Sequence, residues 1–225
     1  MEQAEPRLAE ALTAEQSWEA DGVPVLRAAV TLPQMAGGSA AARRFNRYYR
    51  RYCRAYISYC KQILLPQAEA AFRAALSVSA PWEAARSELT YRVVCQAGGT
   101  WSVVCDARET VGSLPPFLLR RAEVWDMKSG LPLPLSEFFP PRSRCRRMLL
   151  RFAREETQRR IECGAVYREN WRSALRRALS TQNFYLTDDG LCFFYPLCAL
   201  AGAEKGIVSF TMPYDEENGP FIVRT

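Results

Sequence analysis

The side chains able to do chemistry are scattered along this sequence and form no recognisable catalytic set. Adjacent carboxylates occur at Glu155–Glu156, Asp188–Asp189 and Asp215–Glu217. Neighbouring side chains on a helix or a turn point in different directions, so these pairs do not converge on one substrate atom. Asp188-Asp189-Gly190 has the composition of a hairpin turn, because glycine supplies the positive φ that a tight turn needs. We therefore assign these carboxylates to turns and solvated surfaces.

The 225 residues include no histidine. That absence excludes Ser-His-Asp and Cys-His catalysis and the usual zinc hydrolase ligands. The glycine pairs Gly37-Gly38 and Gly98-Gly99 match no phosphate-binding pattern and are typical of loops. We predict that the protein is not an enzyme, with no catalytic, cofactor-binding or metal-binding residues and no cofactor. No binding residues are assigned from the sequence.

Eight cysteines are present, and no pair has the C-x-x-C spacing of a zinc ribbon or a redox motif. Cys53 and Cys60 are stacked on one helix face, and Cys95 and Cys105 could face each other across a hairpin. Secreted proteins bridge such pairs, whereas cytosolic ones use cysteine as a small apolar residue. We favour reduced core cysteines. The others are Cys145, Cys163, Cys192 and Cys198.

Basic residues are concentrated in two stretches. Residues 43–61 hold seven basic and no acidic side chains, and residues 142–179 hold twelve arginines against four glutamates. The formal net charge of the whole chain is only +6, so the basicity is local. Such helices either bind an anionic polymer or present a solvated face whose arginine stems cover apolar surface. The solvated face is the commoner case.

The expected elements follow in chain order. Residues 1–20 alternate Ala and Glu and predict a weak helix or a frayed N-terminal arm. Residues 23–32 predict a strand near a sheet edge because of Pro24. With Ser39 as N-cap, a long helix is expected over 40–65, resuming after Pro66 to about 76. Its core stripe comprises Phe45, Tyr48, Tyr52, Tyr56, Tyr59 and Ile63, at three- and four-residue steps.

Strands are then expected over 88–95, 100–111 and 117–126, with a turn at 97–99. Asp126 begins a further turn in which its side chain caps the backbone. Helices are expected over 143–163 and 167–179, and three strands over 184–187, 191–195 and 206–214. The aromatic side chains of these last strands either line a ligand groove or form the core, which is the commoner case. They are Phe184, Tyr185, Phe193, Phe194 and Tyr195.

This order indicates an α+β fold, in which an antiparallel β-sheet is packed by one long N-terminal helix and two further helices. We expect one domain over 21–225.

Two segments carry a family resemblance. Residues 183–191 (Asn-Phe-Tyr-Leu-Thr-Asp-Asp-Gly-Leu) lead to Phe193-Phe-Tyr-Pro196 and then to Phe210-Thr-Met-Pro-Tyr214. The other segment, 124–139, continues from a strand through the Asp126-Met-Lys-Ser-Gly130 turn to Leu-Pro-Leu-Pro-Leu-Ser-Glu-Phe-Phe. The sequence resembles the C-terminal extracellular domain of RsiV-type anti-sigma factors, also found beside some peptidoglycan deacetylases, most clearly over 85–214.

The resemblance implies the same α+β fold and a domain that captures a protein ligand, which is lysozyme in the known family case. In anchored members the capture is passed to a sigma factor. The metal site of the accompanying deacetylases needs His, so the resemblance implies no such activity here.

No apolar run approaches the roughly 20 residues that span a bilayer, and the start at Met1 lacks a signal-peptide pattern. As written, the chain is expected to be cytoplasmic. If it is truncated or mis-started, the extracellular location usual for the family is expected instead.

We predict a non-catalytic binding or sensor module with a protein partner. The net charge favours an acidic partner over a basic one. The alternative is a nucleic-acid or anionic-polymer binder acting through its arginine-rich helices, including Arg146, Arg147, Arg151 and Arg154.

Overall fold

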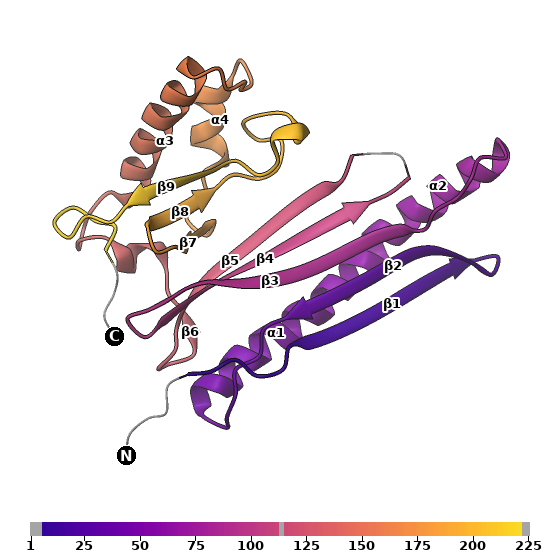
Figure 1. The fold of residues 1–225 in the computed structure, drawn as a ribbon, viewed down its shortest axis with the longest axis horizontal. Helices are drawn as coiled ribbons and strands as arrows, with labels where there is room; N and C mark the ends of the chain where they lie inside the picture. Colours follow the sequence, from indigo (N-terminus) through magenta and orange to yellow (C-terminus); the bar gives the residue numbers. More distant parts are fainter. Residues whose placement is uncertain (1–5, 113–114, 222–225) are drawn as a thin grey trace. The chain divides into compact units, whose positions relative to one another are not determined.

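The computed structural model describes residues 6–112 and 115–221 and has the expected α+β architecture (Figure 1). Strands β1 to β6 form one sheet in sequence order, and β7, β8 and β9 form another. The chain divides into two compact units, Met1–Tyr91 with Cys105–Leu118 and Arg92–Val104 with Leu119–Thr225. We call them unit 1 and unit 2. The expectation of one domain over 21–225 stays a prediction.

Unit 1 begins with a hairpin that the sequence analysis missed. Residues Leu12–Ala20 form strand β1 and pair antiparallel with β2, Val23–Leu32. The prediction of a helix or a frayed arm is therefore wrong for 12–20, and residues 1–5 lie outside the described part. Asp21 and Gly22 make the two-residue turn with φ of 53° and 75°. Two positive φ values define the type I′ turn, whose twist suits a hairpin.

Strand β2 has the bounds predicted from its sequence, but it is not at a sheet edge. It lies between β1 and β3, Ala85–Ala97. Pro24 is tolerated there because pairing with β3 starts only at Leu26, and a register shift in β1 lies at Glu19, opposite Pro24. Strands β2 and β3 run parallel, because the intervening helices carry the chain back to the same end of the sheet.

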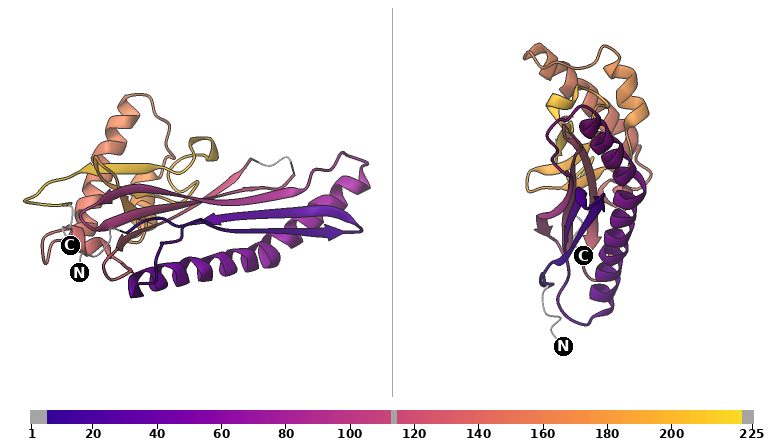
Figure 2. Two further views of the ribbon diagram at one scale, coloured as in Figure 1. Left: turned by 60° about the horizontal axis from the view of Figure 1, so that its bottom comes forward. Right: turned by 90° about the vertical axis from the view of Figure 1, so that its right-hand side faces the viewer.

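That connection is a long helix in three parts. It comprises α1, Ala40–Tyr59, then a π-helical turn, Cys60–Leu64, and then α2, Leu65–Ser77. The side chain of Ser39 accepts a hydrogen bond from Ala42 N at 3.0 Å, as expected of an N-cap. The helix lies along β1 and β2 in the left view of Figure 2.

Two of the six residues in the predicted core stripe of this helix are buried. Phe45 and Tyr56 are buried, but Tyr48, Tyr52 and Tyr59 are half-buried and Ile63 is 49% exposed. The seam that is buried against the sheet passes instead along Phe45, Tyr49, Cys53, Tyr56, Cys60, Leu64 and Ala68. The half-buried tyrosines therefore flank the seam, and Cys53 and Cys60 lie in its middle.

The middle strands match the sequence expectation closely. Strand β3 is followed by β4, Thr100–Thr110, and by β5, Phe117–Asp126. The side chain of Asp126 accepts hydrogen bonds from Lys128 N and Ser129 N at 2.9 and 3.2 Å. The predicted Asp turn is confirmed, and it leads to the short strand β6, Leu131–Pro132, which pairs with the end of β5.

Unit 2 continues with two helices and a small sheet. A 3-10 turn, Leu135–Phe138, precedes α3, Cys145–Glu162, and α4, Trp171–Ala178. The sheet consists of β7, Phe184–Leu186, β8, Gly190–Phe194, and β9, Ser209–Pro213. A 3-10 turn, Ala203–Lys205, joins β8 to β9. Both helices and all three strands contribute to one hydrophobic core.

Candidate functional site

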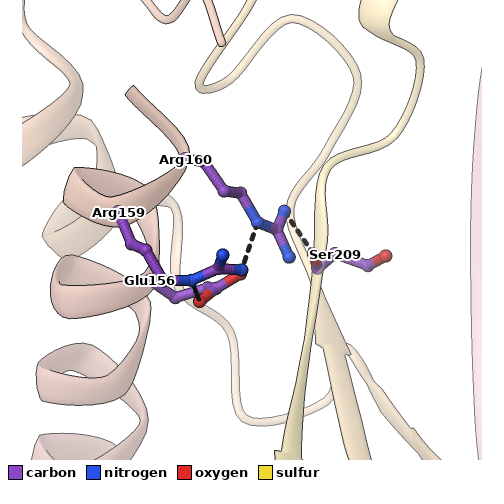
Figure 3. A network of polar contacts seen from close by, with 4 residues as sticks. All are labelled: Glu156, Arg159, Arg160 and Ser209. Atoms are coloured by element: carbon purple, nitrogen blue, oxygen red, sulfur yellow. Dashed lines mark hydrogen bonds and ion pairs between the residues drawn. The ribbon is translucent and has the colours of Figure 1, made fainter. Parts of the chain in front are cut away.

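Helix α3 is tied to strand β9 by a polar network around Glu156 (Figure 3). Arg159 donates to both carboxylate oxygens of Glu156, at 2.8 and 2.7 Å, and Arg160 Nε donates to Oε1 at 2.8 Å. Arg160 Nη1 also donates to the main-chain oxygen of Ser209 at 3.0 Å. The Arg160 guanidinium lies 4.7 Å from the centre of the Phe210 ring. Arg160 thus joins the helix to an edge of the small sheet.

The electrostatics of this network favour a permanently charged Glu156. The hydrogen bond from Arg159, with support from Arg160, lowers the pKa of the Glu156 carboxyl to about 2. A carboxylate held by two guanidinium groups does not exchange protons near neutral pH. Glu155 points away as an exposed side chain, so the Glu155–Glu156 pair is structural and does not converge.

A groove of about 720 Å³ lies in unit 2 alongside α3. Its apolar lining comes from Met148 and Phe152 on α3 and from Met212 and Tyr214 at the end of β9. All four side chains pack against the core of unit 2 and are only partly buried. The polar rim consists of Arg151, Glu155, Asp215 and Asn218. We call this the α3–β9 groove.

One wall of the α3–β9 groove is fixed by the turn after β9. The side chain of Asp215 accepts hydrogen bonds from Glu217 N, Asn218 N and Asn218 Nδ2, each at 3.0 Å. The bonds from Asn218, and then that from Glu217, lower the pKa of Asp215. Tyr214 donates its hydroxyl proton to Thr187 O at 2.8 Å. Asp215 therefore shapes the rim of the groove.

Strand β9 reaches the groove because Gly190 leaves room for it. A Cβ atom built on Gly190 would lie 2.1 Å from Met212 O and 2.8 Å from Met212 C. Such contacts involve main-chain atoms, which cannot swing aside. Asp188-Asp189-Gly190 was predicted as a turn, and β8 begins at Gly190. The close approach of the β9 main chain is therefore a second reason, besides the turn, for a glycine at position 190.

The outward face of α3 carries a row of arginines. Its members lie at steps of three, four and three residues; the first is the N-cap residue of α3, and helical spacing places the other three on one side of the helix. They are Arg144, Arg147, Arg151 and Arg154, and all are exposed. The opposite side holds the buried Leu149, Ala153 and Thr157. Arg146, which the sequence analysis grouped with the row, instead donates from Nη2 to Arg176 O at 2.8 Å. We call the four the arginine row.

The basic residues of α1 are exposed as well. Arg50 Nε and Arg54 Nε donate to main-chain oxygens four residues earlier, at 3.2 and 3.4 Å, and Arg43 donates to Gly38 O. Arginines that bind the carbonyl oxygens of their own helix are typical of a solvated face. The described contacts of α1 therefore favour the solvated interpretation of the first basic stretch.

The aromatic side chains of the small sheet are core residues. Those of Phe184, Phe193 and Tyr195 belong to the main core of unit 2, and those of Tyr185 and Phe194 belong to a smaller cluster with Val104 and Ala122. Phe184, Phe193, Phe194 and Tyr195 are buried, and Tyr185 is half-buried. Phe193 stacks on Phe210 with ring centres 5.5 Å apart. These five side chains do not line the α3–β9 groove. The lining of the groove instead consists of methionine and aromatic side chains from α3 and from the end of β9. In the sequence these residues are recognisable only as apolar, so nothing there marked them as a binding site.

Unit 1 contains a buried carboxylate that sequence reasoning missed. Glu109 on β4 is 5% exposed and accepts a hydrogen bond from the Tyr59 hydroxyl at 3.1 Å. Burial raises its pKa. Nearby, the hydroxyls of Tyr56 and Ser87 share a hydrogen bond of 2.7 Å. The alternation of β4 offered a signal, because Glu109 has the same parity as the buried Cys105 and Ala107.

The described residues, 6–112 and 115–221, contain no group of three or more Cys, Asp or Glu side chains placed to hold a metal ion. Each helix within the same residues is too short or too polar to cross a bilayer.

Residues 136–215 match a family model described as a protein of unknown function, DUF3298. This segment includes α3, α4 and the small sheet. No curated protein matches the sequence.

Two solved structures share the fold. A DUF3298 family member from Bacteroides fragilis NCTC 9343 is 14% identical, with a TM-score of 0.65, covering 94% of this chain and 92% of that one. A DUF3298 family protein from Pseudomonas aeruginosa PAO1 is 12% identical, with a TM-score of 0.56, covering 92% and 91%. The chain is thus similar to DUF3298 proteins in sequence over 136–215 and in fold over nearly its whole length.

Proposed function

We propose that this protein is a non-catalytic binding module that captures a protein partner in the α3–β9 groove. The observation that carries the proposal is the chemistry of the groove. Four half-buried apolar side chains form the lining, and a charged rim surrounds it. Protein interfaces combine an apolar centre with a polar rim in this way. Methionine adapts its shape to a partner, which suits Met148 and Met212 to such a surface.

The rim is preorganised for binding. The hydrogen bonds of Asp215 hold the turn over 215–219, and Tyr214 is anchored by its bond to Thr187. A surface that is ordered before it meets its partner loses less conformational entropy on binding. The groove therefore offers a fixed template for one element of a partner, with affinity arising from the buried apolar contacts.

The partner is an acidic protein. The chain carries a formal net charge of +6, and Arg151 belongs both to the groove rim and to the arginine row. The rim also carries Glu155 and Asp215, so the attraction comes from the arginine row beside the groove. Opposite charge steers an acidic partner toward that row and raises the rate of association. The RsiV-like resemblance supports a protein ligand and a sensing role. The proposed ligand class rests on charge and the proposed role on that resemblance.

Site-specific photo-cross-linking tests this proposal. A photoreactive phenylalanine analogue replaces Arg151 at the rim and, in a matched control, Arg73, whose side chain is 75% exposed on α2. Each change removes one arginine. With lysate and envelope extract, we expect one acidic protein to cross-link at position 151 and not at 73, including at high salt. Met212→Glu should abolish that adduct, because it places a charge in the apolar lining.

Equal adducts at both positions, or an adduct that Met212→Glu leaves unchanged, would contradict binding in the groove.

A second candidate function, binding of an anionic polymer, is favoured by the arginine row. Three exposed arginines on one face of α3, with exposed Arg144 at its N-cap, form a positive strip. Binding of this kind weakens steeply with salt, with a slope of about −0.9 per neutralised phosphate on duplex DNA. The changes Arg147→Glu, Arg151→Glu and Arg154→Glu should abolish binding to labelled DNA. The matched changes Arg47→Glu, Arg51→Glu and Arg54→Glu on α1 should preserve it. Retained binding after the changes on α3 would exclude this function.

A further inference from the structure

Strand β1 is an open edge. In the sheet order β1-β2-β3-β4-β5-β6, β1 pairs with β2 on one side, and no other strand within residues 6–112 and 115–221 pairs with its second side. The pairing with the β2 side extends towards the N-terminus through the bridge Leu8↔Met35. Alternate residues of a strand turn their N–H and C=O groups away from the paired side. Strand β1, nine residues long, therefore presents a row of main-chain donors and acceptors.

The two faces of β1 differ in chemistry. Leu12, Ala14 and Trp18 lie opposite the buried Leu32, Val30 and Leu26, so they share the face that is turned to the core. All three are nevertheless only half-buried. This inner row is apolar except for the exposed Gln16, which lies opposite Ala28, and it is incompletely covered, as is expected next to a missing neighbouring strand.

The outer face of β1 is polar and charged. Glu15 lies opposite the exposed Ala29, and Ser17 lies opposite the exposed Arg27. A hollow of about 530 Å³ lies over this face, and its charged lining consists of Glu15 and Glu88 together with Arg27 and Arg86. A long side chain from an added strand would find open space here, with Glu15 of β1 as its nearest charged neighbour on the edge strand and the arginines on the inner strands β2 and β3.

The segment around β1 is strongly acidic. Four acidic residues and no basic residue occur between positions 10 and 21, in a chain whose formal net charge is +6. They are Glu10, Glu15, Glu19 and Asp21, and all are exposed. Opposite charges on directly paired strands stabilise a sheet, and like charges destabilise it.

We propose that β1 accepts an extended, cationic segment of a partner protein as an additional strand of the sheet. The segment alternates apolar and basic residues, so that its apolar side chains cover Leu12, Ala14 and Trp18 while Lys or Arg faces Glu15. Main-chain hydrogen bonds provide affinity in such strand addition, and the alternate side chains provide specificity. This edge belongs to unit 1, so it is a second binding surface in addition to the α3–β9 groove.

A second copy of this chain is a poor occupant of the same edge. Antiparallel pairing of two β1 strands would bring Glu15 and Glu19 of one copy close to the same residues of the other. That arrangement repels, whereas a basic segment is attracted. Charge complementarity therefore selects the cationic partner.

The test uses the full chain and two labelled nine-residue peptides with blocked ends, one alternating Val and Lys and the other alternating Val and Glu. We expect the lysine peptide to bind about tenfold more tightly, since several cross-strand charge pairs change sign. Bound lysine peptide should slow hydrogen exchange of main-chain amides within residues 12–20. Fluorescence anisotropy measures affinity, and mass spectrometry measures exchange.

Two variants locate the effect. Glu15→Lys should shift the preference towards the glutamate peptide by about fivefold, on the scale of a single cross-strand pair. Glu204→Lys makes the same charge change at an exposed residue of unit 2 and should leave the preference unchanged. The proposal is overturned if the lysine peptide fails to protect 12–20 at about 1 mM, a concentration at which weak specific complexes form. Equal effects of the two variants, or a dimer of the free protein that already protects these amides, would also overturn it.

Discussion

At the scale of single residues, the pKa values of two carboxyl groups are shifted in opposite directions. Glu109 is buried with one hydroxyl partner, so its pKa is raised. Glu156 is held by Arg159 and Arg160, so its pKa is lowered to about 2. The first carboxylate costs stability when ionised, and the second contributes stability when ionised. Neither belongs to the α3–β9 groove.

Glu109→Gln should stabilise the protein at neutral pH. Because the folded-state pKa is raised, the carboxyl contributes its full stability below its unfolded pKa and loses it as the pH rises through the folded pKa. The amide cannot ionise, so the variant should gain about 1 kcal/mol at pH 8 relative to wild type and little at pH 4. Urea unfolding across this range measures the difference. A gain independent of pH, or one matched by exposed Glu88→Gln, would contradict this account.

Glu156→Gln should destabilise the protein with the opposite pH dependence. Its folded-state pKa is lowered, so its stabilising contribution exists above the unfolded pKa and disappears as the pH falls towards about 2. We expect a loss of about 1 kcal/mol at pH 7, the upper value for a partly exposed ion pair. The loss should vanish in acid. Exposed Glu155→Gln is the control and should change little; a comparable loss there would mean that the arginine contacts of Glu156 are not responsible.

At the scale of elements, the position of β9 depends on Gly190. Gly190→Ala places a Cβ atom against the main chain of Met212. Such overpacking costs about 1–3 kcal/mol, with more where the backbone cannot shift. Gly38→Ala is the matched control, because a Cβ built there meets nothing within 4 Å. Thermal unfolding should separate the two variants clearly. Equal melting temperatures would show that β9 adjusts without strain.

At the scale of the whole molecule, the thiols differ in accessibility. Of the eight cysteines, Cys163 is exposed, whereas five are buried. Burial also raises the pKa of Cys53, Cys60 and Cys95, which reduces the reactive thiolate. Iodoacetamide should therefore modify Cys163 first and the five buried thiols only on unfolding, as measured by mass spectrometry. Cysteines that resist alkylation in the unfolded, unreduced protein would reveal disulfides.

The features that depend on neighbouring residues in the chain were predictable. Strands β2 and β5 have the predicted bounds, and Ser39 and Asp126 form their expected cap and turn. Each depends on contacts within a few residues, which local composition specifies. The hairpin at Asp21-Gly22 was equally local, and its turn sequence was the available signal for β1. The Ala and Glu content of 1–20 favoured a helix, but pairing with β2 overrides that propensity.

The buried seam of the long helix marks the limit of local reasoning. A regular period predicted Tyr48 and Tyr52 in the core, but the sheet buries Tyr49 and Cys53 instead. Spacing identifies an apolar side of a helix, and the neighbouring surface selects which residues of that side are covered.

The sequence by itself determined the α+β class, most elements and their turns, because these depend on composition and on local periodicity. It also excluded catalysis by histidine, since the chain contains none. Only the tertiary structure decided which side chains meet. It brings Met148 and Phe152 of α3 to Met212 of β9 and to Tyr214, which follows that strand. It also leaves one side of β1 without a partner strand among the residues that the structure describes. Both surfaces arise from segments distant in sequence, whose packing depends on the shape of the whole core.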